Sequence, residues 1–167
     1  TPLYGRSEQE PFSFGYPTVV SVGDRYLMYY DRLDVWPNDP SEDPKFQLSI
    51  AESRDGLRWS LLSSHPLPLD GTETAITRPA VFPKNGRWYM IFTVCKNGTY
   101  SLDAAVSDDA QTWKRLDNFT FSCSGDPWDS SEQAYPAILV YQGTHYLLYN
   151  GNSYGRTGIG IARLETW

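Results

Sequence analysis

The stretch RPAVFPKNGRWYMIF (residues 78–92) decides the fold, because the chain repeats its pattern at two other places. The other copies are YPTVVSVGDRYLMYY (residues 16–30) and YPAILVYQGTHYLLY (residues 135–149). Each copy predicts an apolar strand, a turn with Gly and an aromatic strand, and a third strand candidate follows, at 48–51, 103–106 and 159–162. The opening prolines, Pro17, Pro79 and Pro136, are 62 and 57 residues apart, a spacing typical of multi-stranded propeller blades.

Composition supports a single β-rich domain with an acidic surface. The 167 residues include 15% aromatic side chains, which fit pleated and half-buried strands. The net charge of −6 argues against a nucleic-acid partner, because phosphate binding depends on cationic side chains. No apolar run approaches the roughly 20 residues that span a bilayer, so no membrane partner is expected. Because the chain opens at Thr1, removal of an N-terminal segment is one interpretation, and the cellular location stays open.

The predicted fold class is all-β, a partial β-propeller of three antiparallel blades within one domain that spans residues 1–167. The blades are expected at about 16–62, 74–117 and 130–167, after an N-terminal segment at 1–15. Residues 34–44, with three prolines, predict a long exposed loop between two strands of the first blade. The stretches SRDGLRW (53–59) and SDDAQTW (107–113) predict an Asp turn that leads a Trp into a fourth strand. No helix is predicted, and the third blade lacks such a closing segment.

The sequence gives no sign of metal, nucleotide or catalytic-triad chemistry. His65 and His145 lie at unrelated places in the repeat, and neither has the spacing of a metal ligand or a triad partner. Cys95 and Cys123 favour free, buried thiols, with a disulfide in an oxidising compartment as the alternative. No metal and no cofactor are therefore expected.

Carboxylates are the better candidates for chemistry. Acidic residues stand shortly before each blade's opening proline: Glu8 and Glu10, then Glu73, then Asp129 and Glu132. Residues before the first strand of a blade face a shared channel mouth, so these acids are expected at one end of one cavity. Two or three carboxylates at an aromatic pocket are what glycoside hydrolysis requires, although capping of turns would also explain them.

A second candidate site is the segment YNGNSYGRTG (149–158), which joins two strands of the third blade. Asn150, Asn152, Tyr154 and Arg156 offer paired donors and acceptors with a flat ring, which suits sugar hydroxyls or an anionic group. An unusually Gly-rich hairpin is the structural alternative.

The chain resembles the five-bladed propeller glycoside hydrolases, the superfamily of arabinanases, β-xylosidases, invertases and levansucrases. The residues that carry the resemblance are ETAITRP (73–79), AESRDGLRW (51–59), DSSEQAYP (129–136) and YNGNSYG (149–155). The greatest similarity is to a bacterial branch of predicted glycosyl hydrolases that are β-fructosidase-like. Members of the superfamily have about twice this length, so the chain resembles their three C-terminal blades.

The resemblance implies site residues. It implies Glu73 and Glu132 as the catalytic acids, with Arg78, Asn150, Asn152 and Arg156 as sugar contacts. The blade that usually supplies the base is absent, unless Glu10 or Glu8 replaces it. Asp31 and Arg32 follow the second strand and are an additional candidate sugar-binding pair, and Asp129 and Tyr154 complete the candidate substrate-binding residues.

Three functions follow as expectations. The first is a glycoside hydrolase-like protein that acts on an oligo- or polysaccharide through paired carboxylates in a propeller cavity. The second is a carbohydrate-binding propeller fragment without catalysis, and the third is a structural assembly module. Because open strand edges invite pairing, a homodimer that completes the propeller is expected, with a fragment of a longer protein as the alternative.

Overall fold

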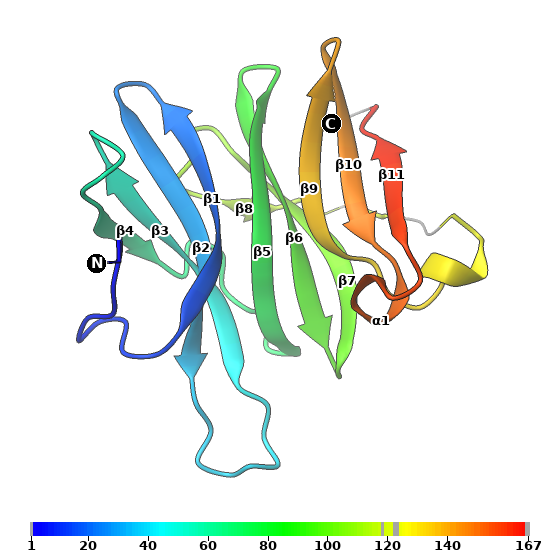
Figure 1. The fold of residues 1–167 in the computed structure, drawn as a ribbon, viewed down its shortest axis with the longest axis horizontal. Helices are drawn as coiled ribbons and strands as arrows, with labels where there is room; N and C mark the ends of the chain where they lie inside the picture. Colours follow the sequence, from blue (N-terminus) through cyan, green and yellow to red (C-terminus); the bar gives the residue numbers. More distant parts are fainter. Residues whose placement is uncertain (1, 118, 122–123, 166–167) are drawn as a thin grey trace.

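The computed structural model describes residues 2–117, 119–121 and 124–165, and antiparallel strands dominate it (Figure 1). The first blade contains β1 (Phe14–Val22), β2 (Arg25–Val35), β3 (Lys45–Ser53) and β4 (Ser60–Ser64). The second contains β5 (Glu73–Lys84), β6 (Arg87–Lys96), β7 (Thr99–Ser107) and β8 (Lys114–Arg115). The third contains β9 (Ala134–Tyr141), β10 (Thr144–Asn150) and β11 (Ile159–Arg163). The predicted all-β, partial propeller fold is confirmed.

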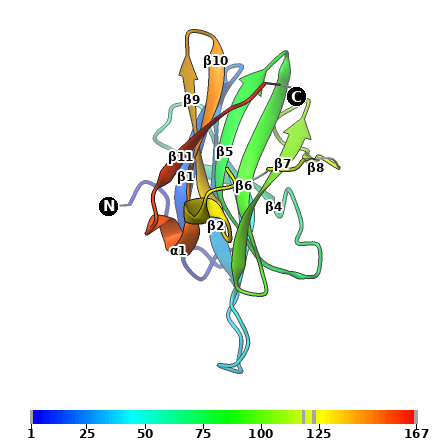
Figure 2. The same cartoon turned by 90° about the vertical axis from the view of Figure 1, so that its right-hand side faces the viewer.

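The three blades lie side by side, with the third blade toward the viewer when the molecule is turned (Figures 1 and 2). One parallel bridge between Phe46 of β3 and Ala75 of β5 joins the first two blades near the groove described below. The loop between β2 and β3 projects from the end of the molecule in both views, as the prolines of residues 34–44 predict.

Apolar cores fill the two interfaces between blades. The first core packs Leu27, Tyr29 and Ile50 of the first blade against Met90 and Phe92 of the second. Successive residues of a strand point to opposite faces, so Met28 and Tyr30 belong to a different cluster on the outer face of the first blade. A third cluster packs Tyr89 and Ile91 against Leu147 and Tyr149. The period-2 pattern of β2 and of β6 thus places apolar side chains in clusters on both faces of each strand.

The predicted Asp turns close the first two blades. Asp55 accepts hydrogen bonds from the backbone N–H groups of Leu57 and Arg58, at 2.8 and 2.7 Å. Asp109 repeats this arrangement with the N–H groups of Gln111 and Thr112. Each turn is followed by the blade's short fourth strand, and the Trp113 side chain packs edge-on against Tyr29 of the first blade. These acids therefore act in the fold, as predicted.

A bulge at the start of each blade turns one side chain toward the centre of the molecule. The residue before the opening proline has a positive φ in all three blades: 52° at Tyr16, 52° at Arg78 and 60° at Tyr135. The strand register shifts at the same places. A positive φ is costly for these residue types, and such strain concentrates at functional sites. The repeat therefore presents three equivalent, strained positions.

The third blade differs from the prediction and from the other two blades. Two short helical turns, η1 (Pro127–Asp129) and α1 (Asn152–Gly155), flank its strands, although no helix was expected. Ser153 and Tyr154 of α1 have left-handed φ values of 54° and 61°, so this segment is a tight turn rather than a regular helix. On the outer face of the blade, Leu139, Ile159 and Ile161 are exposed. The predicted homodimer, which would complete the propeller, stays a prediction that light scattering can check.

Candidate functional site: an aromatic groove between the blades

A groove of about 180 Å³ lies where the three bulges meet. Its lining residues come from all three blades: Tyr16, Asp31, Phe46, Ala75, Thr77, Arg78, Tyr100 and Tyr135. Two adjoining pockets share Tyr16 with it, one of them also Asp31 and Phe46, the other Arg78 and Tyr135. Half of the residues that line the groove are aromatic, and the lining also holds one carboxyl and one guanidinium.

Arg78 stands at the centre of this groove between two tyrosine rings. Its guanidinium carbon lies 3.8 Å from the centre of the Tyr16 ring and 3.5 Å from the centre of the Tyr135 ring. Tyr16, Arg78 and Tyr135 occupy the same place in the three repeats. The bulge residues of the first and third blades therefore pack on either side of the bulge residue of the second. Sequence reasoning selected Arg78 but missed both tyrosines, which alignment of the repeats would have identified.

Tyr154 extends the aromatic wall beyond Tyr135. The Tyr154 ring stacks on the Tyr135 ring with centres 6.2 Å apart, and it meets the Tyr100 ring edge-on at 5.4 Å. The Tyr154 side chain is 63% exposed, an unusual position for a large ring. Tyr154 is not among the residues that line the groove, and its role as a sugar contact stays a prediction.

Asp31 is the carboxyl of the groove and is only 3% exposed. The hydroxyl of Thr77 donates a hydrogen bond to its Oδ2, whereas Oδ1 has no hydrogen-bond partner within the described residues. Burial raises the pKa of Asp31 to about 6, against the opposing effects of the Thr77 hydrogen bond and the nearby Arg78 charge. The carboxyl can therefore hold or release a proton near neutral pH.

The position of Asp31 is also part of the repeat. Asp31, Thr93 and Asn150 each lie 14 residues after the opening proline of their blade. Thr93 accepts a hydrogen bond from the backbone N–H of Tyr135 at 2.8 Å, just as Asp31 accepts one from Thr77 of the next blade. In the first two blades this position thus supports the bulge of the next blade, and of the three equivalent residues only Asp31 is ionisable.

Arg32, predicted to pair with Asp31, lies on the opposite face of β2. It contacts Asp34 at 2.9 Å, the ring nitrogen Nε2 of His65 at 3.1 Å and, at 3.6 Å, the carboxylate of Glu10. Adjacent strand residues point in opposite directions, so Asp31 and Arg32 cannot share one ligand through this face. Glu10, a predicted catalytic acid, is buried here and accepts hydrogen bonds from the hydroxyls of Tyr4 and Tyr30, both 2.6 Å.

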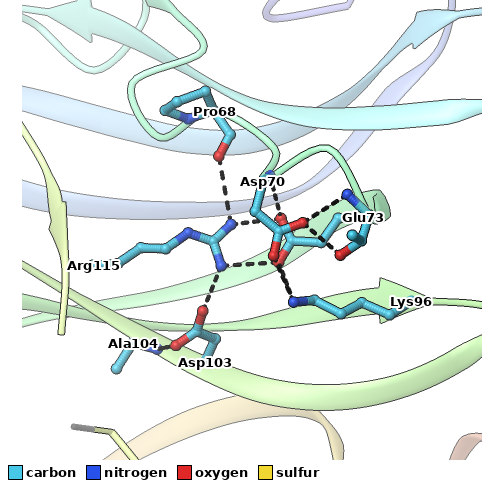
Figure 3. A network of polar contacts seen from close by, with 8 residues as sticks. Pro68, Asp70, Glu73, Lys96, Asp103, Ala104 and Arg115 are labelled. Carbon is cyan, nitrogen blue, oxygen red and sulfur yellow. Dashed lines mark hydrogen bonds and ion pairs between the residues drawn. The ribbon is translucent and has the colours of Figure 1, made fainter. Parts of the chain in front are cut away.

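Glu73, the other acid before a proline, lies in a network of ion pairs away from the groove lining (Figure 3). Its oxygens accept hydrogen bonds from both terminal nitrogens of Arg115, at 2.9 and 2.6 Å, and one from the backbone N–H of Asp70. Lys96 adds a longer contact of 3.7 Å, and Arg115 also binds Asp103. Every oxygen of Glu73 is thus occupied by partners within the protein, and its predicted catalytic role stays a prediction.

The segment 149–158 is held mainly by the structure around it. The Asn152 side chain accepts hydrogen bonds from the N–H groups of Ser131 and Glu132 and donates one to the carbonyl of Pro127, at 2.8 Å. A Cβ at Gly151 would lie 2.5 Å from the Trp128 ring, so only glycine fits. Asn152 therefore ties two loops together, which favours the structural alternative for this residue.

Three further predicted residues, Asp129, Asn150 and Glu132, lie in the third blade and contact its loops. Asp129 is fully buried, and despite burial its pKa is lowered by hydrogen bonds from Ser124 and from the hydroxyl of Tyr149. The Asn150 amide donates to the carbonyl of Tyr154 at 3.2 Å and so supports that turn. Glu132 is half-buried, accepts a hydrogen bond from the Ser153 N–H at 2.7 Å and interacts electrostatically with Tyr135.

A second, smaller pocket of about 40 Å³ is lined by residues that include Glu10, Arg32 and Asp34. Arg156 is exposed, and its side chain has no polar partner among the residues that the structure describes. Within these same residues, no group of three or more His, Cys, Asp or Glu side chains is placed to hold a metal ion. Cys95 is a free, buried thiol, and Cys123 lies outside the described residues. None of the described helices combines the length and apolarity needed to cross a bilayer.

Comparisons with known proteins agree on the fold. No known protein-family profile matches the chain. Two uncharacterized proteins of Mycobacterium tuberculosis, MT1551 and Rv1502, are each 35% identical over 167 residues, which is 98% of this chain. The chain spans about half the length of these relatives, 55% in both cases.

Solved structures with a similar fold include several glycoside hydrolases. A family 117 glycoside hydrolase of the marine bacterium Zobellia galactanivorans superposes with a TM-score of 0.73 at 18% identity, over 96% of this chain and 54% of that one. A family 32 β-fructofuranosidase of Bombyx mori superposes with a TM-score of 0.70 at 19% identity, over 95% of this chain and 35% of that one. A family 43 endo-arabinanase of Bacillus licheniformis superposes with a TM-score of 0.65 at 20% identity, over 96% of this chain and 53% of that one. The chain therefore shares the fold of propeller glycoside hydrolases, whereas the predicted bacterial branch and the number of blades in a complete assembly stay predictions.

Proposed function

We propose that the groove binds an oligo- or polysaccharide and that Asp31 and Glu132 carry its hydrolysis. The observation that supports this most strongly is Asp31: a buried carboxyl in an aromatic groove, with a pKa raised to about 6 and one unpartnered oxygen. A carboxylic acid that keeps its proton near neutral pH is what departure of a sugar leaving group needs. The fold shared with glycoside hydrolases raises the weight of this chemistry, although fold alone does not assign it.

In the proposed reaction the two carboxyl groups have opposite roles. The protonated Asp31 gives its proton to the glycosidic oxygen while the bond from that oxygen to the anomeric carbon breaks. Glu132 accepts a proton from the water whose oxygen bonds to the anomeric carbon, so the net change is addition of one water across the bond. Glu132 suits the second role because it stays half-exposed beside Tyr135.

The aromatic wall supports binding as well as chemistry. Tyr16, Tyr100 and Tyr154 supply aromatic surface against which the apolar face of a sugar ring can pack. Binding without turnover is the second candidate function, since Asp31 is the one carboxyl in the described groove lining and hydrolysis needs a pair.

The test is product release from a panel of oligosaccharides, measured with the wild type and with Asp31→Asn, Glu132→Gln and the control Asp39→Asn in the exposed loop. We expect Asp31→Asn to lower turnover about a hundredfold or more, since a general acid typically contributes that much, while saccharide affinity changes little. Glu132→Gln should have a similar effect, and the control none. Binding without product in the wild type would favour the second candidate function. Turnover that survives both substitutions would rule out the proposed roles.

A further inference from the structure

The guanidinium group of Arg78 packs against a tyrosine ring on each face, and its N–H groups make no hydrogen bond within the described residues. The two tyrosine rings cover its faces at 3.8 and 3.5 Å. No hydrogen bond or ion pair to its nitrogens occurs within the described part of the chain. Its five N–H donors point outward in the plane of the group, between the rings, so any partner must approach edge-on.

Other arginines with restricted exposure are bonded differently. Arg115 binds Glu73 and Asp103, Arg32 binds Asp34, and Arg25 binds Glu52 at 2.6 Å. In a chain of net charge −6, carboxylates are plentiful, yet none makes an ion pair with Arg78 among the described residues. Asp31 lies close enough to affect Arg78 electrostatically, but Thr77 supplies its hydrogen bond. The fork of Arg78 is therefore left for a partner from outside these residues.

The position of Arg78 in the repeat supports a role in recognition. The equivalent residues of the first and third blades are tyrosines, so the fold itself does not need a cation at this place. Arg78 also adopts a φ of 52° immediately before a proline, a conformation that costs energy for a residue with a side chain. Clamped between rings, its side chain has lost its freedom before any ligand arrives, which lowers the entropic cost of binding.

We propose that the groove recognises an acidic sugar, whose carboxylate forms a paired hydrogen bond with the planar edge of Arg78. This rests on the proposed function, because it names the substrate class of the same groove. A planar carboxylate matches the guanidinium fork with two parallel bonds, a match that an ammonium group cannot reproduce.

The experiment compares sugars that differ only in that charge. Affinities are measured by calorimetry for oligomers of galacturonate, glucuronate and mannuronate, and for the methyl ester of each. The wild type should bind at least one free acid about tenfold more tightly than its ester, as expected for two charge-assisted hydrogen bonds in a groove partly open to water. Arg78→Gln should bring the ratio of the two affinities close to one, and Arg78→Lys should retain only part of it. The exposed Arg54→Gln is the matched control and should leave the ratio unchanged.

The outcomes separate this inference from the proposed function. Neutral sugars or esters that bind as well as the acids would overturn the inference and leave the proposed function in place. A sulfated galactan oligomer that binds when no uronate does would also overturn it, because the recognised anion would then be a sulfate. If no saccharide in either panel binds, the proposed function fails and the inference with it. Thermal unfolding of each Arg78 variant shows whether a loss of affinity reflects a loss of the folded state.

Discussion

Two buried carboxyl groups of this molecule have opposite surroundings. Glu73 and Asp31 are both 3% exposed. Glu73 is the first residue of β5, and Asp31 of β2 accepts a hydrogen bond from Thr77 of β5. Glu73 is surrounded by Arg115, Lys96 and a backbone N–H (Figure 3), whereas Asp31 has one hydroxyl donor and an oxygen without a partner. Burial makes a charge costly unless cations or donors compensate it. Glu73 is therefore suited to hold the fold together, and Asp31 to exchange a proton with a ligand.

The largest effect is expected from Glu73→Gln, which removes the charge but keeps the shape. Arg115 would keep Asp103 and the carbonyl of Pro68 but lose two charge-assisted bonds to a fully enclosed carboxylate, so we expect a loss of roughly 3–4 kcal/mol in the free energy of unfolding. Urea denaturation measures this loss. Glu52→Gln is the matched control, because its ion pair with Arg25 is about one-third exposed and should contribute less than about 1 kcal/mol. Unchanged stability with loss of turnover would instead support the catalytic role predicted from the sequence.

The second expected effect is a dependence of stability on pH that comes from Asp31. Its pKa is raised from 3.8 to about 6 on folding, so between these values the folded state holds a proton that the unfolded state has released. The free energy of unfolding therefore falls as the pH rises from about 4 to 6, by up to about 3 kcal/mol for a shift of this size. Well below pH 3.8 the group is protonated in both states and contributes no pH dependence.

The contribution of Asp31 is isolated from that of other acids when the unfolding free energy of Asp31→Asn is subtracted from that of the wild type at each pH. Asp70 and Asp109 have pKa values lowered by hydrogen bonds, from Lys96 above all for the first and from the N–H of Thr112 for the second, so they stabilise the fold as the pH rises in a more acidic range. Urea unfolding at several pH values, for the wild type and Asp31→Asn, gives a difference that should slope between pH 4 and 6. A flat difference over this range would show that Asp31 ionises normally and would remove the main support for its role as an acid.

Local patterns carried most of the fold prediction. Alternating strands, turns with Gly and the Asp–Trp turns depend on residues a few positions apart, so the three repeats could be recognised directly. The partner of Glu73 could not, since Arg115 is 42 residues away and reaches Glu73 only through the pairing of β6, β7 and β8. An acid shortly before the opening proline of a blade can therefore be a catalytic group or a member of a structural ion pair, and the local sequence does not distinguish the two.

The groove residues occupy equivalent positions of the three repeats, and this pattern is visible in the sequence. Tyr16, Arg78 and Tyr135 share one place in the repeat, and so do Asp31, Thr93 and Asn150. Alignment of the three copies identifies both sets, because equivalent positions of blades converge on one centre. The alternation of β2 also separates Asp31 from Arg32, which adjacency in the sequence conceals. Superposition of repeats thus carries more information about this site than the search for acids before each proline.

The smallest effect is expected from Thr77→Val, which removes the hydrogen bond to Asp31 at nearly constant volume. This bond lowers the pKa of Asp31 against the larger effect of burial, so its loss should raise that pKa further and extend the falling part of the stability curve above pH 6. The cost in stability itself should be about 1 kcal/mol, the usual contribution of one hydrogen bond. Thr18→Val is the matched control, because the Thr18 hydroxyl bonds the carbonyl of Pro79 and does not touch Asp31. If both variants lose stability but give the same pH profile, Thr77 only holds the strands together; a shift in the Thr77 variant alone would show that one hydroxyl sets the proton affinity of the groove.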